Sequence, residues 1–141
     1  MPKKIIGRTD KADFPLLDLF DMDIKIDTGA YTSSIHCHKV KVEDYVLKCV
    51  FYDEGHPLYN GKEVTFKSYK IAKVKSSNGI TQKRYKVNTT IILFDKTYKI
   101  DLTLSTRSKM KYPVLIGRSF LSKKFIVDVN QKYVSYQNKQ K

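Results

Sequence analysis

The sequence is poor in the residues that mark disulfide-rich, membrane-spanning or exported proteins. It holds two cysteines, Cys37 and Cys49, which are too few for a disulfide framework and favour a reduced, cytoplasmic protein. Its longest apolar runs, residues 91–94 and 113–117, are far too short to cross a bilayer. The first residues lack the apolar segment of a signal peptide. With no tryptophan, six glycines, ten tyrosines and seven phenylalanines, the composition fits a β-rich globular chain better than a disordered one.

Acidic residues are also scarce, because 14 aspartates and glutamates stand against 27 lysines and arginines, a formal net charge of +13. Such an excess attracts polyanions, whether nucleic acid, acidic peptides or ribosomal surfaces. Most of the basic residues are lysines spread singly through alternating stretches, such as Lys39, Lys41, Lys70 and Lys73. Lysines in this arrangement also form an ordinary solvated face that protects sheet edges, so the charge alone selects no partner.

Alternation of apolar and polar side chains dominates the chain and predicts strands. Residues 98–104 alternate strictly, and residues 40–42, 46–52 and 63–75 follow the same pattern. Residues 73–86 predict a β-hairpin, because the Asn-Gly pair near its centre suits a type I′ turn with positive φ.

Helix is expected in two short places, a turn at 105–110 and a helix at 118–123 that follows Gly117. Since the 141 residues contain no linker or repeat, we expect one domain over residues 1–141, with a frayed tail at 137–141. The sequence therefore predicts an all-β fold, a small barrel or sandwich with one short helix near the C-terminus.

The most informative stretch is Asp-Thr-Gly-Ala at residues 27–30, which follows an alternating apolar run at 24–26. A carboxylate at the end of a buried strand is costly unless it is hydrogen-bonded or shares a proton with a second carboxylate. An aspartate that works on a peptide bond uses such a pair, in which the ionised member takes a proton from water and the protonated member donates to the carbonyl oxygen. Because the chain has one Asp-Thr-Gly, two copies of Asp27 would have to meet across the axis of a C2 dimer.

A second feature is the apolar run at 113–117, which ends at Gly117 just before Arg118. A glycine at a strand end lets another backbone approach closely. We therefore expect Gly117 to pack against the loop that carries Asp27.

Taken together, these features resemble the retropepsin-type aspartic proteases, and most closely the bacterial retropepsin-like family labelled as ATP-dependent zinc proteases. The segments that carry the resemblance are 25–36, 76–79 with 84–85, and 107–118, which span most of the chain in the family's order. The resemblance implies a closed acid-protease-like barrel and an aspartic-type endopeptidase, a hydrolase that acts as a homodimer on peptide or protein substrates. It implies acidic or glutamate-rich substrates more weakly, because relatives are associated with ligases that append glutamate to proteins.

The resemblance also implies roles for the matching residues. Asp27 would be catalytic, Thr28 would brace the paired loops across the dimer axis, and Gly29 would let those loops approach. The hairpin tip would form a flap that closes over substrate and excludes water. The flap residues and the basic candidates for substrate binding are Ser76, Ser77, Asn78, Gly79, Arg84, Arg107 and Arg118.

Two positions depart from proteases of this type. Retroviral members carry an aspartate where this chain has Tyr31, and that aspartate pairs with the arginine that matches Arg118. The partner of Arg118 is therefore open, either a structural contact or a substrate carboxylate. Ala30 lacks a hydroxyl that could donate to the carboxylates, so we expect a less acidic activity optimum than in proteases with a hydroxyl there. The insertion at residues 53–62 has no assigned role.

No metal and no cofactor are expected. His-Cys-His at 36–38 supplies three donors, but neighbours on a strand point to opposite faces, so only His36 and His38 could share a metal. A third ligand would have to come from elsewhere, and a histidine packed against the barrel is the simpler interpretation. The chain also has no Walker-type glycine loop for a nucleotide.

Two non-catalytic interpretations stand beside the protease. Asp27 could be a capped turn residue in an inactive member of the family. The chain could also be a basic binding module for RNA, ribosomal or acidic partners, with aromatic residues between its lysines. Because no RNA-binding signature is present, nucleic acid is the less favoured partner, and no membrane is expected. The position of the basic side chains relative to Asp27 distinguishes these functions.

Overall fold

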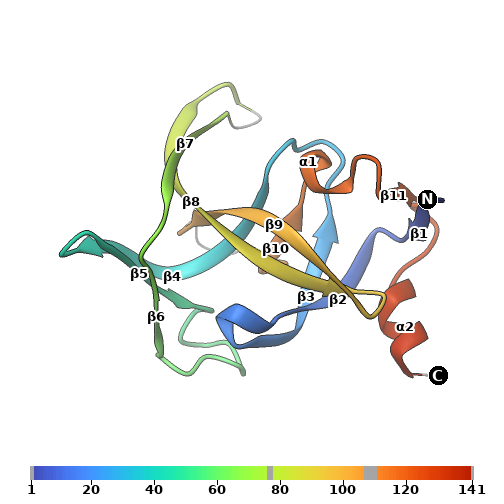
Figure 1. Cartoon of the computed structure of the whole chain (residues 1–141), viewed down its shortest axis with the longest axis horizontal. Helices are drawn as coiled ribbons and strands as arrows, with labels where there is room; N and C mark the ends of the chain where they lie inside the picture. The colour runs from blue at the N-terminus through green and yellow to red at the C-terminus, as the bar shows by residue number, and fades with distance from the viewer. Residues whose placement is uncertain (1, 76–77, 107–110, 141) are drawn as a thin grey trace.

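Six strands close into a barrel in the computed structural model, which describes residues 2–75, 78–106 and 111–140 (Figure 1). The strands follow the order β10, β3, β2, β8, β9 and β4, and β4 pairs again with β10 to complete the ring. The all-β barrel predicted from the sequence is confirmed. The bounds are β2 Thr9–Phe14, β3 Leu19–Ile26, β4 Ser33–Glu43, β8 Thr81–Leu93, β9 Lys96–Ser105 and β10 Val114–Ile116.

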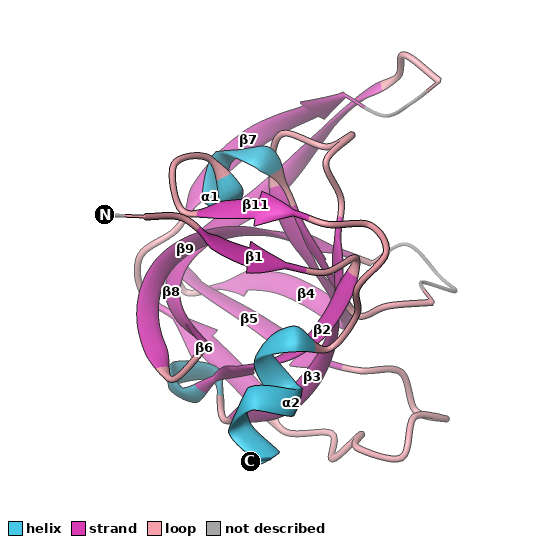
Figure 2. Cartoon of the chain, turned by 90° about the vertical axis from the view of Figure 1, so that its right-hand side faces the viewer, coloured by secondary structure: helices cyan, strands magenta, loops and turns pink. Residues whose placement is uncertain are grey.

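The remaining elements extend or cover this barrel. Strands β5 and β6 continue the sheet beyond β4, β7 pairs with β8, and β1 pairs in parallel with β11. Figure 2 shows β1 and β11 side by side, with α2 below them beside β2. The bounds are β1 Lys4–Ile6, η1 Pro15–Leu17, β5 Val46–Phe51, β6 Glu63–Phe66, β7 Lys70–Lys75, α1 Arg118–Leu121, β11 Phe125–Val127 and α2 Val134–Gln140.

The alternation in the sequence decides which side chains fill the barrel. Strands β8 and β9 pair in antiparallel fashion with Val87 opposite Leu102. The inward residues Val87 and Ile91 of β8 and Ile100, Leu102 and Leu104 of β9 are all buried. Side chains two residues apart share a face of a strand, so the strand expected at 98–104 faces the core as its pattern predicted.

The stretch at 63–75 was expected to be one strand, but it forms two. Its first part is β6, which pairs with β5, and its last part is β7, which pairs with β8. At residues 67–69 the chain stops pairing with β5 and turns to pair with β8, so the stretch does not form one continuous strand. The apolar positions change phase across that break, from Val64 and Phe66 to Tyr69 and Ile71, as expected where one strand ends and another begins.

The expected helix after Gly117 is present as α1, with Phe120 and Leu121 buried. The expected turn at 105–110 is not helical where the structure describes it, because Ser105 is the last residue of β9. Residues 107–110 lie outside the described part of the chain. No helix in the described ranges is long and apolar enough to cross a membrane.

Both cysteines are free thiols buried in the adjacent strands β4 and β5. A hydrogen bond with Cys49, together with burial, holds the pKa of the Cys37 thiol well above its usual value. Cys37 is therefore a protonated core residue and a poor nucleophile.

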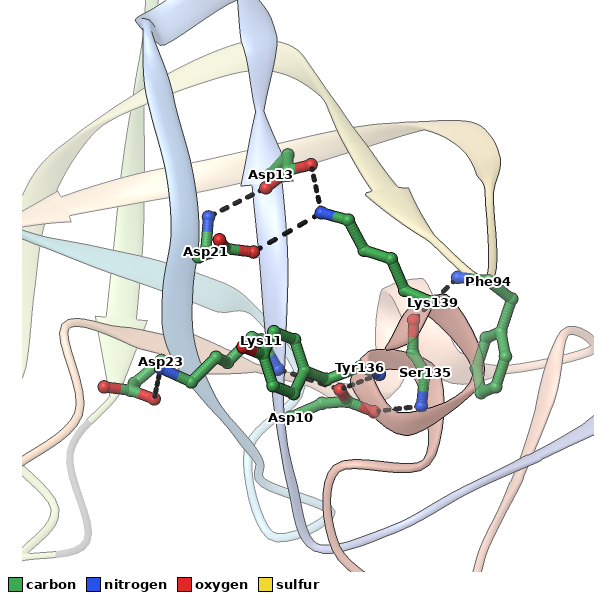
Figure 3. Close-up of polar contacts among 9 residues, drawn as sticks. All are labelled: Asp10, Lys11, Asp13, Asp21, Asp23, Phe94, Ser135, Tyr136 and Lys139. Atoms are coloured by element: carbon green, nitrogen blue, oxygen red, sulfur yellow. Dashed lines mark hydrogen bonds and ion pairs between the residues drawn. The ribbon is translucent and has the colours of Figure 1, made fainter. Parts of the chain in front are cut away.

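The tail expected to be frayed from residue 137 is instead the last part of helix α2, which ends at Gln140. Asp10 on β2 accepts hydrogen bonds from the Ser135 and Tyr136 backbone N–H groups at 3.0 and 3.1 Å (Figure 3). Farther along the helix, Lys139 lies 3.5 Å from Asp13 and 3.4 Å from Asp21. These contacts hold a short polar helix that the sequence pattern does not predict, while residue 141 lies outside the description.

Candidate active site

The loop that carries Asp27 joins two strands that lie on either side of a third. Strand β10 is parallel to β3, with Ile116 opposite Ile26, and antiparallel to β4, with Val114 opposite Ile35. The Asp27 N–H donates to the carbonyl oxygen of Ile116 at 2.8 Å, so the pairing with β10 continues one residue beyond β3. This arrangement fixes the backbone of Asp27 at the end of the barrel.

The side chain of Asp27 is half-buried at the base of its loop. Its carboxylate accepts a hydrogen bond from the Gly29 N–H at 3.2 Å, and the Ala30 N–H donates to the Asp27 carbonyl at 3.2 Å. A carboxylate oriented by a backbone donor and still open to solvent can hold a water molecule. This geometry suits the sequence-predicted role of Asp27.

Gly117 packs directly against this loop, as expected. A methyl group added at Gly117 would lie 2.5 Å from the Thr32 carbonyl oxygen and 2.7 Å from that of Tyr31, inside van der Waals contact. The Gly117 N–H also donates to Ser33 Oγ at 2.9 Å. The glycine thus allows the backbone of the β10–α1 junction to approach the backbone of the Asp27 loop.

Arg118 supplies the contacts that the sequence left open. Its guanidinium Nη1 donates to the Thr28 carbonyl oxygen at 2.9 Å, and its guanidinium carbon Cζ lies 5.8 Å from the centre of the Tyr31 ring. Its backbone N–H donates to the Ala30 carbonyl at 2.9 Å. Arg118 therefore braces the Asp27 loop through a carbonyl and an aromatic ring, whereas the resemblance to the retroviral proteases implied an aspartate at the place of Tyr31. The Tyr31 side chain is 65% exposed.

The hairpin predicted at residues 73–86 is present and is formed by β7 and the first part of β8, which project from the barrel (Figure 1). In Figure 1 its tip and the β3–β4 loop lie on the same, upper side of the molecule. Gly79 has φ +85° and the Ile80 N–H donates to Asn78 Oδ1 at 3.3 Å. The last pair of the hairpin is Lys75 opposite Thr81. This register differs by one residue from the register that a two-residue turn at Asn78-Gly79 would give. Ser76 and Ser77 lie outside the described residues.

A groove runs between the hairpin and the ends of β4 and β9. It has a volume of about 600 Å³ and is lined by Val40, Gln82, Lys83, Arg84, Tyr85, Leu104, Ser105 and Thr106. The Arg84 guanidinium donates to Gln82 Oε1 at 3.1 Å within β8. Of the other predicted basic candidates, Arg118 lies at the Asp27 loop and Arg107 lies outside the described residues.

With this geometry in view, a family model described as "Retropepsin-like aspartic endopeptidase RimB", or RimB-like, matches residues 5–138. The chain belongs to this family. Family membership confirms the resemblance found in the sequence and fits the loop, glycine and hairpin described above.

Curated relatives place the same kind of domain in longer proteins. The chain is 32% identical over 135 residues to a probable alpha-L-glutamate ligase of Shewanella pealeana, a match that covers 93% of this chain and 30% of that protein. A probable alpha-L-glutamate ligase of Desulfotalea psychrophila is also 32% identical, over 89% of this chain and 28% of its own length. The RimB-like chain thus spans less than a third of these relatives.

A solved structure shares the fold over almost its full length. The crystal structure of Lpg0085 from Legionella pneumophila, titled as a protein with unknown function, superposes with a TM-score of 0.72 at 25% identity. The match covers 95% of this chain and 99% of the other.

Within this RimB-like fold, the insertion at 53–62 is tied back to the barrel by a contact that the sequence did not indicate. His36, on β4 and 5% exposed, has its Nε2 2.9 Å from Asp53 Oδ1. His38 Nδ1 lies 3.6 Å from the same oxygen. The hydrogen bond with His36 lowers the pKa of Asp53 below its usual value of 3.8. A histidine on a buried strand and a carboxylate in a polar loop give no sequence signal that they meet.

The His-Cys-His motif at 36–38 lies beside the acidic residues of the 53–62 insertion. Among the described residues, no group of three or more histidine, cysteine or acidic side chains has an arrangement that could hold a metal ion. His36 is packed against the barrel and held by a carboxylate, which is the simpler of the two interpretations of that motif. His56 stacks on Tyr52 with ring centres 4.2 Å apart.

Proposed function

We propose that this RimB-like chain is an aspartic endopeptidase whose active form is a homodimer with two copies of Asp27 at its axis. The observation that carries the proposal is the Asp27 loop itself. Its carboxylate is oriented by the Gly29 N–H, and Gly117 and Arg118 hold the loop from behind. Membership of a retropepsin-like endopeptidase family supports the same activity.

In the proposed reaction, the two Asp27 carboxyls share one proton, because two carboxylates in contact do not both ionise. The ionised carboxylate accepts a proton from a water molecule, whose oxygen attacks the carbonyl carbon of the peptide bond. The protonated carboxyl donates to the carbonyl oxygen. Proton transfer to the amide nitrogen then breaks the C–N bond and releases an acid and an amine. Thr28 would brace the two loops across the axis, and Gly29 would let them approach.

The proposed substrates are acidic, glutamate-rich peptides. The net charge of +13 favours anionic partners, and the groove beside the flap holds Lys83 and Arg84. The curated relatives are named for ligation of glutamate, and in them this domain belongs to the same polypeptide. A peptidase that removes what such a ligase adds is a chemically coherent pairing.

The decisive experiment compares wild type with Asp27→Asn on a glutamate-rich peptide and on a general peptide mixture. We expect the variant to fold normally and to lose at least about three orders of magnitude in kcat/KM. Equal cleavage by both proteins would contradict the aspartic mechanism.

A mixing experiment tests the dimer. After wild type and Asp27→Asn have exchanged subunits, activity should fall with the square of the wild-type fraction if both aspartates are needed. A linear fall, or a monomer by light scattering under assay conditions, would contradict the shared site.

The second candidate is a non-catalytic RNA-binding module on the same fold. The specific observation in its favour is that residues 64–94 carry seven basic residues and no acidic one. Specific binding of RNA by a protein that cleaves neither peptide would favour this function over the protease.

A further inference from the structure

The flap hairpin places lysines directly opposite one another. Its register pairs Lys70 with Lys86 and Lys73 with Lys83. Like charges in directly opposite positions destabilise a sheet by up to about 1 kcal/mol for each pair. No ion pair in the described part of the chain involves any of these four lysines. A hairpin that carries two such pairs is weakened in the absence of an anion.

The two pairs lie on opposite faces of the hairpin. On β8, Lys83 and Tyr85 share a face with Val87, which is buried in the barrel. Because opposite residues of an antiparallel pair point to the same side, Lys73 lies on this inner face as well. By the same alternation, Lys86 shares a face with the exposed Asn88, so the Lys70–Lys86 pair is on the outer face.

The groove is lined by residues from both faces of β8, Lys83 and Tyr85 from the inner face and Gln82 and Arg84 from the outer face. Of the four paired lysines, Lys83 lines the groove, and Lys73 lies directly opposite Lys83 in the hairpin. Tyr85 is held by an edge contact with Tyr69 at 5.7 Å between ring centres. The inner face therefore brings Tyr85 and Lys83 to the groove, with Lys73 paired opposite Lys83.

We propose that Lys73 and Lys83 together bind one carboxylate side chain of the substrate. The proposal rests on the peptidase function proposed above and names the side chains that select an acidic substrate. Directly opposite residues have Cβ atoms about 5 Å apart, so both ammonium groups can reach the two oxygens of one carboxylate. The bound anion removes the repulsion across the hairpin, so binding and ordering of the flap favour each other.

The matched variants are Lys73→Gln/Lys83→Gln on the inner face and Lys70→Gln/Lys86→Gln on the outer face. Both remove two charges from the same hairpin, and both relieve one like-charge pair. Each is assayed on a peptide with glutamate near the scissile bond and on the same peptide with glutamine there. We expect the inner variant to lose at least about tenfold in kcat/KM on the glutamate peptide only, as expected for a lost charge-assisted contact. The outer variant should change either value by less than about threefold.

Equal losses in the inner and outer variants would mean that only the net charge matters, and would overturn the proposal. Equal losses on both peptides would assign the inner lysines a structural role instead. Melting temperatures of both variants show whether the hairpin still folds. As a rescue, the Lys73→Glu/Lys83→Glu variant should prefer a peptide with lysine at that position. If the preference does not reverse, that result also contradicts the role proposed for the pair.

Binding without cleavage separates this proposal from the proposed function. In the Asp27→Asn background, the labelled glutamate peptide should bind at least about tenfold more weakly when the inner pair is changed. If the binding depends on the inner pair but wild type cleaves neither peptide, the proposed peptidase function is contradicted and the lysine proposal is not. Cleavage of the glutamate peptide that ignores the inner pair would contradict the lysine proposal alone. If the inner variant loses affinity for single-stranded RNA and keeps it for the peptide, the ligand is nucleic acid and the proposal is wrong.

Discussion

Two aspartates on neighbouring strands of the barrel occupy opposite kinds of site. Asp10 on β2 is fully buried, and its carboxylate accepts backbone hydrogen bonds from Lys11, Ser135 and Tyr136 (Figure 3). Asp27, just after β3, is half-buried and accepts one from Gly29. A carboxylate whose oxygens are occupied by the protein's own backbone holds the fold together. One that keeps its oxygens open to solvent can act on a water molecule.

The largest effect expected from this comparison follows removal of the Asp10 carboxylate. Asp10→Ala leaves three backbone N–H groups without their partner, two of them at the start of α2. We expect a loss of about 3 kcal/mol in the free energy of unfolding, from the usual cost of unsatisfied buried groups. The folded enzyme should keep its kcat. Thermal unfolding and peptide cleavage measure the two quantities.

Asp27→Asn is the matched control for that experiment. It should change the melting temperature little and remove the activity. Two outcomes would contradict the division between a structural and a reactive carboxylate. One is that Asp10→Ala loses activity and keeps its stability, and the other is that Asp27→Asn loses stability and keeps its activity.

A smaller effect is expected when the support behind Asp27 is pushed out of place. Gly117→Ala puts a methyl group 2.5 Å from the Thr32 carbonyl oxygen, and the backbone must move to admit it. We expect a loss of about 1 to 3 kcal/mol in stability and about tenfold or more in kcat/KM. Gly55→Ala is the control, because nothing lies within 4 Å of a methyl group there. Similar results for the two variants would show that the close approach is unimportant.

The exposed Asp53 extends the comparison to a third carboxylate and to pH. Its pKa is lowered by His36, so its contribution to stability is full above pH 3.8 and is lost as the pH falls through the lower, folded-state pKa. Asp53→Asn should therefore be slightly less stable than wild type at pH 7, by less than about 1 kcal/mol. That difference should vanish in strong acid. A difference that persists or grows there would contradict a stabilising His36–Asp53 hydrogen bond.

Asp10 should behave in the opposite direction. Burial raises the pKa of Asp10 above 3.8, so its advantage over asparagine is full at low pH and declines as the pH rises through the folded-state pKa. Melting temperatures of Asp10→Asn and wild type across pH 3 to 7 measure this. A gap that widens toward neutral pH would show that the backbone hydrogen bonds outweigh the effect of burial.

The smallest change would give the Asp27 carboxylate an additional hydrogen-bond donor. Ala30→Ser adds a hydroxyl that could donate to the catalytic carboxylates, which lowers the pKa of a carboxyl. The acid limb of the kcat/KM profile should then move to lower pH, by up to about one unit. Ala30→Gly, which adds no donor, should leave it in place. A wild-type optimum already well below pH 4 would contradict the premise.

Local patterns predicted much of this molecule because they depend on neighbouring residues. Alternation at 98–104 predicted β9, Asn-Gly predicted the flap hairpin, and Gly117 after an apolar run predicted the close packing behind the Asp27 loop. The break between β6 and β7 was missed, although the alternation changes phase between Phe66 and Tyr69. The roles of Thr28 and Gly29 in a dimer stay predictions.

The contacts that the sequence did not predict are all long-range. Helix α2 has a polar sequence, and the carboxylate that holds it is 125 residues away in the chain. Arg118 donates to the carbonyl oxygen of Thr28. Because every residue has a backbone carbonyl, the sequence does not identify Thr28 as the partner. Asp53 meets His36 because the insertion folds back over β4.

The sequence by itself determined the candidate reactive group and its immediate setting, because Asp-Thr-Gly, the glycine at 117 and the alternating strands are local chemistry. Tertiary structure decided which of the aspartates is buried and which stays open, what Arg118 braces, and that Lys83 lines the groove. Those outcomes depend on barrel closure and on strand register, where a shift of one residue turns every side chain to the other face.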